Sequence, residues 1–203
     1  MKSFPESDTA FGLQTRALAA LHRTSELKAL CEERLKRSPN DPFTLRRTAF
    51  GALSSGDFEG ARSVYRQLVN EGKASASDLN GFAWYSLFQG KTTNEDLEAA
   101  LKAAQLSNKN ASILHTLGCV YTELEKIKEA REVLIQAMDA TSLDEPDDAY
   151  WYAFGRIAEQ SGEVDAARAN YERVTPPKNE LDLAGSPYEL ARARLATIRQ
   201  GKK

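Results

Sequence analysis

A small residue recurs at a fixed place in a pattern that repeats about every 34 residues, and this feature constrains the fold more than any other. The small residues are Ala49, Ala83, Gly118 and Gly155. Each follows a large apolar residue by four positions, and these large residues are Leu45, Leu79, Leu114 and Trp151. A glycine inside a helix costs about 1 kcal/mol relative to alanine. A position kept small in every copy therefore indicates that another helix packs closely against it.

The second half of each copy carries a column of alanines, formed by Ala61, Ala130 and Ala167. Apolar residues occur at helical spacing on both halves, and turns such as SSGDFEG (54–60) and QSGEVDA (160–166) separate them. These turns carry a glycine that ends one helix and an acidic residue that opens the next. The pattern predicts paired helices in which the two columns of small residues face each other, and no strand pattern is present.

The spacing and residue types resemble the tetratricopeptide repeat over roughly residues 42–175. Its best copy is formed by Trp151, Phe154, Gly155, Ala167 and Tyr171. The resemblance implies an all-α, right-handed superhelical solenoid of antiparallel helix pairs, with four to five repeats and a C-terminal capping helix. The stretch from LNGFAWYSLFQGK to TLGCVYTELEK is also similar to a tandem found in bacterial proteins of this family, which suggests a bacterial source.

We expect one continuous solenoid domain. Its predicted parts are an N-terminal tail (1–7), a degenerate first repeat (8–41), repeats at 42–75, 76–110, 111–147 and 148–180, and a capping helix with a tail (181–203). Solenoids need terminal caps because the last repeat would otherwise expose its apolar face. In the final segment, Leu190, Leu195 and Ile198 lie on one side of a predicted amphipathic helix.

Charge and composition exclude several functional classes. The 27 basic and 29 acidic residues are interspersed, which argues against a nucleic-acid partner. No apolar run approaches the roughly 18 residues of a membrane span, so membrane insertion is not expected. The opening MKSFPESDTA lacks the apolar core of a signal peptide. We therefore expect a cytoplasmic location by default, or a periplasmic one if the chain is an excised fragment.

The chain carries little that suggests catalysis. Cys31 and Cys119 are far apart and in no CxxC spacing, so neither a disulfide framework nor a metal site is expected. His115 and Cys119 share a helical face and could form a Cys–His pair. The alternative, two groove-lining residues, is favoured because no third group is evident to orient a base. Phosphate-binding and hydrolase motifs are absent. We expect no enzyme activity, no catalytic residue and no cofactor.

The family resemblance implies that the first helices of successive repeats line a concave groove. If the large apolar residues (Leu45, Leu79, Leu114 and Trp151) lie in the core, the residues one and five places after each of them face that groove. Phe43, two places before Leu45, joins them at one edge. The candidates are Phe43, Arg46, Phe50, Asn80, Trp84, His115, Cys119, Tyr152 and Arg156. Phe50 and Trp84 would suit the apolar anchors of a peptide or helix. Alternatively, they pack between repeats or under the N-terminal segment.

Family members that bind chaperone tails clamp a C-terminal carboxylate with Lys, Asn and Arg on three first helices. The corresponding positions here are Arg46, Phe50, Gly81, Ser112 and Thr116. Starting one repeat earlier gives Gly12, Arg16, Arg47, Ser77 and Gly81. Neither set matches, so a chaperone-tail clamp is not expected.

These observations favour a non-enzymatic scaffold or adaptor that holds a peptide or protein segment in its groove. A first alternative is the repeat region of a larger envelope-assembly or regulatory protein, where it would position a domain elsewhere. A second is an RNA-binding helical repeat, which the acidic balance opposes and salt-sensitive RNA retention would support. The sequence does not identify the partner.

Overall fold

A computed structural model describes residues 7–179 and 182–201. The regular elements in these ranges are helices, and no strand occurs among them. The all-α class predicted from the sequence is therefore confirmed. Of the predicted N-terminal tail only Ser7 lies within the described residues, and positions 181 and 202–203 of the predicted last segment lie outside them.

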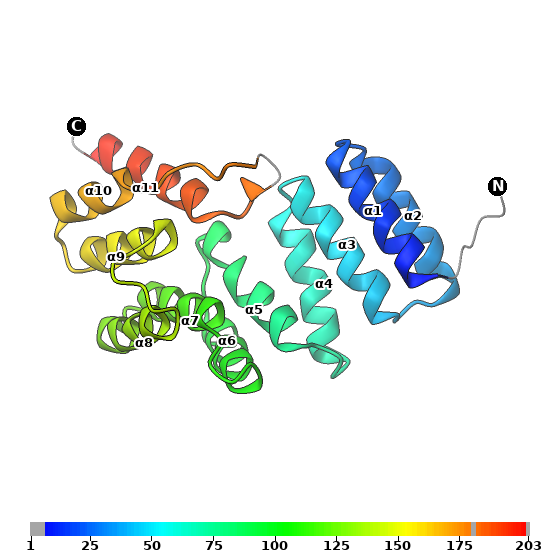
Figure 1. The fold of residues 1–203 in the computed structure, drawn as a ribbon, viewed down its shortest axis with the longest axis horizontal. Coiled ribbons are helices and arrows are strands. Elements are labelled where there is room, and N and C mark those ends of the chain that lie inside the picture. Colours follow the sequence, from blue (N-terminus) through cyan, green and yellow to red (C-terminus); the bar gives the residue numbers. More distant parts are fainter. Residues whose placement is uncertain (1–6, 180–181, 202–203) are drawn as a thin grey trace. The chain divides into compact units, whose positions relative to one another are not determined.

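The chain forms two compact units, Met1–Ala74 and Ser75–Lys203. The helices of the first unit are α1 (Asp8–Ala20), α2 (Thr24–Arg37), α3 (Pro42–Ser54) and α4 (Phe58–Asn70). Helices adjacent in sequence pack together, and α1 also packs against α3 (Figure 1). A buried cluster of Phe11, Leu18, Ala19, Leu27 and Cys31 forms the core between α1 and α2.

The second unit continues the same arrangement of helix pairs. Its helices are α5 (Ala76–Trp84), the 3-10 turn η1 (Leu87–Gln89), α6 (Asn94–Leu106), α7 (Ala111–Glu123), α8 (Ile127–Ala140), α9 (Asp148–Gln160), α10 (Val164–Glu172) and α11 (Pro187–Gly201). Within each pair the two helices pack closely, and the first helices α5, α7 and α9 contact one another in succession. The stacking of helix pairs predicted from the repeat is thus present within this unit.

Local sequence explains where most helices begin. Many have an N-cap side chain that accepts a hydrogen bond from a backbone N–H of the first turn, which otherwise has no partner. These N-caps are Ser7, Asp41, Asp57, Ser75, Asn110 and Asp147. Helix α6 begins with a capping box between Thr93 and Asp96, so the aspartate that interrupts the small-residue pattern has a structural role there.

The last helix caps the second unit, as the sequence predicted. Helix α11 packs against both α9 and α10. Leu190, Leu195 and Ile198 are buried, and they lie on the side expected from their spacing. None of the described helices is both long and apolar enough to cross a bilayer.

The small residues of the first helices give room to large side chains of their partner helices. A Cβ added at Gly118 would lie 2.6 Å from Leu134 Cγ, and one at Gly155 would lie 2.5 Å from Tyr171 Cε1. Ala130 and Ala167 are fully buried, as expected of a close helix pair. The sequence predicted that the small residues of the two helices face each other. This is only partly the case, because a large side chain of the second helix fills the space above each glycine.

We predict that Gly155→Ala destabilises the second unit. The new methyl group would meet the Tyr171 ring, which cannot swing aside freely because its hydroxyl donates to Glu159 at 2.7 Å. Overpacking of this kind costs about 1–3 kcal/mol and outweighs the roughly 1 kcal/mol gained in helix propensity. Urea unfolding followed by circular dichroism measures the difference. The control is Gly201→Ala, whose methyl group meets nothing within 4 Å. Equal stability of both variants would contradict this packing.

Candidate functional site

The predicted groove residues of the first unit lie on α3, at the edge of the buried cluster. Phe43 and Phe50 are half-buried and pack against that cluster, and the Phe43 and Phe11 ring centroids are 6.3 Å apart. Arg46 donates a hydrogen bond to the Lys73 carbonyl oxygen at 3.2 Å. The two aromatic rings are therefore partly core residues, and only their outer edges are available to another molecule.

A hollow of about 270 Å³ lies beside these residues, between α1 and α3, and we call it the α1–α3 hollow. It is lined by Asp8, Thr9, Gly12, Leu13, Arg16, Phe43 and Arg47. Leu13 is 62% exposed, which is unusual for a large apolar side chain. The Arg47 guanidinium lies 5.5 Å from the Phe43 ring centroid and 5.6 Å from that of Phe50.

Arg47 was not among the residues selected from the sequence, although a signal for it was present. It follows Phe43 by four positions and precedes Phe50 by three, so all three share one face of α3. Arg16 and Leu13 lie on α1. In the sequence, Arg16 and Arg47 appeared only as positions of the chaperone-tail clamp that was not expected.

In the second unit, Trp84 is covered by the C-terminal segment, which we define as residues 182–201. Its indole Nε1–H donates to the Gly185 carbonyl oxygen at 2.9 Å. Its ring also packs edge-on against Phe88 and lies 5.7 Å from the His115 ring centroid. Trp84 therefore packs against the next repeat, which was one of the two alternatives, and it is covered by the C-terminal segment, not by the N-terminal segment of the other alternative. Asn80, also on α5, is half-buried, and its Oδ1 has no hydrogen-bond partner among the described residues.

His115 and Cys119 do come together on one face of α7, with Cys119 Sγ 3.6 Å from His115 Nε2. Both side chains are buried, however, and His115 Nε2 also lies 2.9 Å from the Ala149 carbonyl oxygen. Burial raises the pKa of the Cys119 thiol and lowers the pKa of His115. The thiol is therefore protonated at neutral pH, and the pair is not an activated nucleophile and base. Among the described residues, no three His, Cys, Asp or Glu side chains are grouped as metal ligands would be.

Tyr152 and Arg156 do not face an open groove, which corrects the sequence-based expectation. Tyr152 is only 2% exposed and packs against the Tyr171 ring, whereas Trp151, expected in the core, is half-buried beneath the Arg173 guanidinium. Arg156 is 6% exposed. The buried face of α9 thus includes Tyr152, the residue that follows the predicted core residue Trp151.

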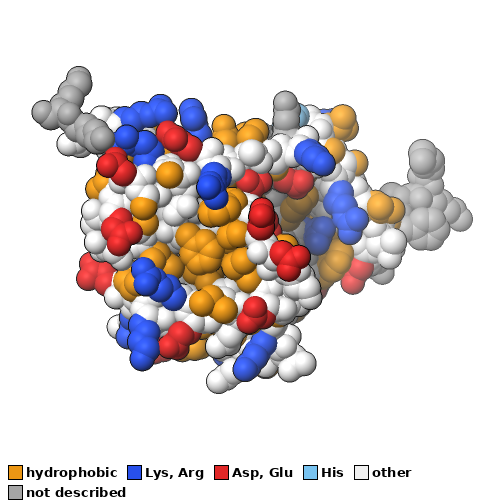
Figure 2. Space-filling view, turned by 60° about the vertical axis from the view of Figure 1, so that its left-hand side comes forward, with side chains coloured by type: hydrophobic (Ala, Val, Ile, Leu, Met, Phe, Trp, Pro, Cys, Tyr) orange, Lys and Arg blue, Asp and Glu red, His pale blue; other side chains and the backbone are white. Residues whose placement is uncertain are grey.

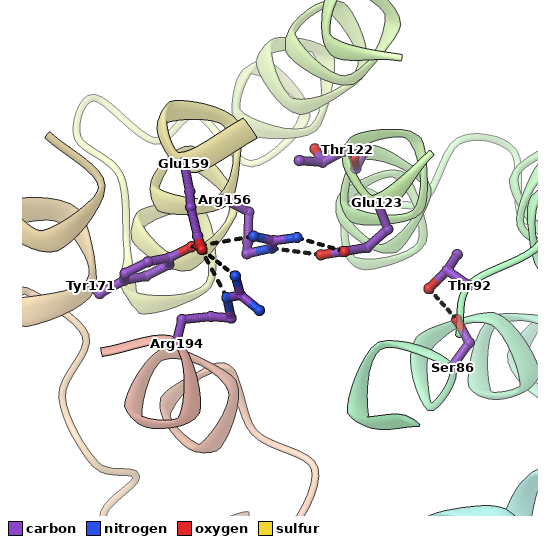
Figure 3. A network of polar contacts seen from close by, with 9 residues as sticks. Ser86, Thr92, Thr122, Glu123, Arg156, Glu159, Tyr171 and Arg194 are labelled. Atoms are coloured by element: carbon purple, nitrogen blue, oxygen red, sulfur yellow. Dashed lines mark hydrogen bonds and ion pairs between the residues drawn. The ribbon is translucent and has the colours of Figure 1, made fainter. Parts of the chain in front are cut away.

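Arg156 is buried because two glutamates neutralise it (Figure 3). Its Nε and Nη2 donate to Glu123 at 2.7 Å, and its Nη1 donates to Glu159 at 2.8 Å. Glu159 also accepts hydrogen bonds from the Tyr171 hydroxyl and from the Arg194 guanidinium. The network joins α7, α9, α10 and α11, and sequence reasoning missed its acidic members.

The network sets the ionisation of Glu159. Burial alone would raise the pKa of this carboxyl, but hydrogen bonds from Arg194 and Tyr171 and the charges of Arg156 and Arg194 hold it at about 2. Burial opposes the charge of Arg156 as well, yet the hydrogen bonds and charge of Glu123 raise the pKa of this guanidinium above its usual value. The charges compensate one another inside the second unit and leave no net attraction for a ligand.

A second hollow, which we call the α8–α10 hollow, lies among α8, α9 and α10 and has a volume of about 350 Å³. It is lined by Arg131, Ile135, Phe154, Ile157, Ala158, Glu163, Ala166 and Asn170. Ile135 is 55% exposed. Figure 2, which brings the side with α8–α10 forward, shows hydrophobic side chains gathered between charged side chains of both signs. This rim has no preference for ligands of one charge.

We predict that Glu159→Gln destabilises the protein at neutral pH and that this effect disappears in acid. A carboxyl whose pKa is lowered on folding, here from 4.5 to about 2, contributes stability above pH 4.5 that is lost as the pH falls through 2. We expect a loss of roughly 1–3 kcal/mol at pH 7, since the buried Arg156 and the half-buried Arg194 lose a charged partner. Chemical denaturation between pH 2 and 7 measures it. Glu132→Gln, on the exposed surface of α8, is the control. A loss that is independent of pH would contradict the account of this network.

Comparison with known proteins agrees with this architecture. The model of the tetratricopeptide repeat family matches residues 111–142 and 149–175. A thermophilic TPR protein from Thermus thermophilus superimposes with a TM-score of 0.59 at 21% identity, over 96% of this chain and 100% of that one. A tetratricopeptide repeat protein from Parabacteroides merdae also has a TM-score of 0.59, at 13% identity, over 97% of this chain and 72% of that one.

No curated protein matches the sequence significantly. At these low identities the two structural matches establish the fold alone. The repeat match falls on α7 to α10, where Gly118 and Gly155 and the large side chains that cover them are found. Residues 111–142 and 149–175 thus match the tetratricopeptide repeat family, and the fold of the chain is that of solved tetratricopeptide repeat proteins.

Proposed function

We propose that the chain is a non-enzymatic scaffold or adaptor that binds a peptide or protein segment on the first-helix face of its first unit. Tetratricopeptide repeats generally mediate protein–protein interaction. The observation that carries the proposal is the α1–α3 hollow, where the exposed Leu13 lies beside the aromatic ring of Phe43. Binding sites on proteins combine such apolar contacts with a few polar groups that fix orientation.

The second unit offers independent support. There the Trp84 indole N–H binds a backbone carbonyl oxygen that lies 101 residues further along the chain. A first-helix residue of this protein can therefore hold a polypeptide backbone that is distant in sequence. In this unit the position is taken by the chain's own C-terminal segment. The corresponding residue of the first unit is Phe50, which lies next to Arg47 at the α1–α3 hollow.

The chemistry of the buried side chains supports the non-enzymatic part of the proposal. Cys119 and His115 are the one Cys–His pair that the sequence indicated, and burial keeps the thiol protonated. The charged groups of the second unit neutralise one another, with Arg156 between Glu123 and Glu159. Groups arranged in this way stabilise a fold and are poorly suited to proton transfer or nucleophilic attack.

The test is selection of peptides from a random phage-displayed library against the full chain, followed by calorimetry of the selected peptides. We predict that Leu13→Glu weakens their binding about tenfold or more, because it removes an apolar contact from the hollow. Leu106→Glu is the matched control, since Leu106 is a helical leucine of similar exposure, 59%, in the second unit. Failure to select any peptide, or equal losses in the two variants, would refute the proposed site.

A further inference from the structure

We infer that the α1–α3 hollow recognises an acidic peptide segment, in which the side chain of a Glu or Asp lies next to a large apolar side chain. This inference rests on the proposed function and names the chemistry of its partner. The carboxylate would lie between Arg16 and Arg47, and the apolar side chain against Leu13 and Phe43. All four residues line the same hollow.

Arg47 supplies one positive charge to the hollow. Its guanidinium is placed between the rings of Phe43 and Phe50, which restricts its motion without neutralising its charge. Its Nε is buried and has no hydrogen-bond partner among the described residues, and none of their carboxylates forms an ion pair with it. A guanidinium that is already held against two rings and that no carboxylate neutralises would bind a carboxylate through its Nη groups at little cost in ordering.

Arg16 supplies a second positive charge from the opposite helix. It is exposed on α1 and makes no ion pair with a carboxylate within the described part of the chain. The hollow has one acidic residue of its own, Asp8, but that carboxylate is already bound by Arg34. The hollow therefore presents two guanidinium groups to a ligand, and its own negative charge is already compensated.

The apolar part of the hollow would hold the large apolar side chain of the peptide. With a volume of about 270 Å³, the hollow has room for a large apolar side chain. Leu13 and Phe43 would contact this side chain, and its burial would also remove the exposed surface of Leu13 from water. One part of the lining is basic (Arg16 and Arg47) and another part is apolar (Leu13 and Phe43). The ligand should therefore carry a carboxylate next to one apolar side chain.

A peptide fits these features better than a nucleic acid. A nucleic-acid surface needs a row of basic groups along the phosphate backbone, whereas this hollow has two and the chain has a net charge of −2. A side-chain carboxylate also fits better than a C-terminal one. The lining contains neither Lys nor Asn, the residues with which carboxylate-tail clamps of this family hold a chain end.

The experiment uses the full chain and the peptide Ser-Glu-Leu-Glu-Phe-Glu-Ser, labelled with fluorescein at its N-terminus and amidated at its C-terminus. Fluorescence anisotropy measures its Kd. We expect binding in the micromolar range, and binding at least about tenfold weaker for the same peptide with Gln in place of Glu. Because the attraction is electrostatic, Kd should also rise with salt concentration.

Substitutions in the protein locate the site. Arg16→Gln should weaken binding about fivefold, and the double variant Arg16→Gln, Arg47→Gln about thirtyfold. Arg192→Gln, at an exposed arginine of α11, is the matched control and should leave Kd unchanged. Circular dichroism melting checks that the double variant remains folded. The exposed Arg16 tests the inference by itself if the Arg47 substitution disturbs the fold.

Four results would overturn the inference. They are equal affinity for the Glu and Gln peptides, an equal loss in Arg192→Gln, tighter binding of a labelled oligothymidylate than of the Glu peptide, and equal affinity for a Gln peptide with a free C-terminal carboxylate. If library-selected peptides bind in a Leu13-dependent way while the Glu peptide does not, the acidic preference is wrong and the binding function stands. If neither kind of peptide binds, the proposed function fails as well.

Discussion

The packing of one large side chain over one small residue, repeated in successive helix pairs, is the contact on which the rest of the structure depends. Leu134 lies over Gly118, and Tyr171 lies over Gly155. A related contact joins consecutive pairs in the first unit, where Leu27 of α2 lies against Gly51 of α3. These contacts let the helix backbones approach closely and fix which side of each first helix is buried. The opposite side of the first helices is then available for other contacts.

The two units use that opposite side differently. In the second unit it is occupied by internal contacts, since Trp84 binds the C-terminal segment and Arg156 is enclosed by Glu123 and Glu159. In the first unit, Arg47 lies between aromatic rings without a carboxylate partner, and Leu13 remains exposed. A compensated buried charge depends on its partners, so that loss of one partner is destabilising, whereas uncompensated charge next to apolar surface is suited to binding a ligand of opposite charge.

The sequence predicted the fold well because the contact that builds it is local and repeated. The small-residue column identified the first helices, and the spacing of Leu190, Leu195 and Ile198 identified the buried side of the last helix. The predicted binding residues were less accurate, since their exposure depends on segments far away in sequence. Trp84 is covered by a loop 101 residues later, and Arg156 is enclosed by a glutamate 33 residues earlier.

The periodicity of a single helix contains no information about such distant partners. It also does not distinguish Trp151 from Tyr152, which are neighbours on α9, although only the second is fully buried. Arg47 could have been selected, because it shares a helical face with Phe43 and Phe50. Whether its charge is compensated, however, is a property of the folded chain.

Nuclear magnetic resonance of the arginine side chains tests the central claim most directly, because each guanidinium gives its own Nε–H signal. The account predicts that the Arg47 signal shifts and saturates as the Glu-containing peptide is added, since a carboxylate bound to this guanidinium changes the environment of its Nε–H. The Arg156 signal should stay in place, since its Nε–H already donates to Glu123 at 2.7 Å. An unchanged Arg47 signal at saturating peptide, or an Arg156 signal that shifts as strongly, would contradict the assignment of the binding site to the α1–α3 hollow.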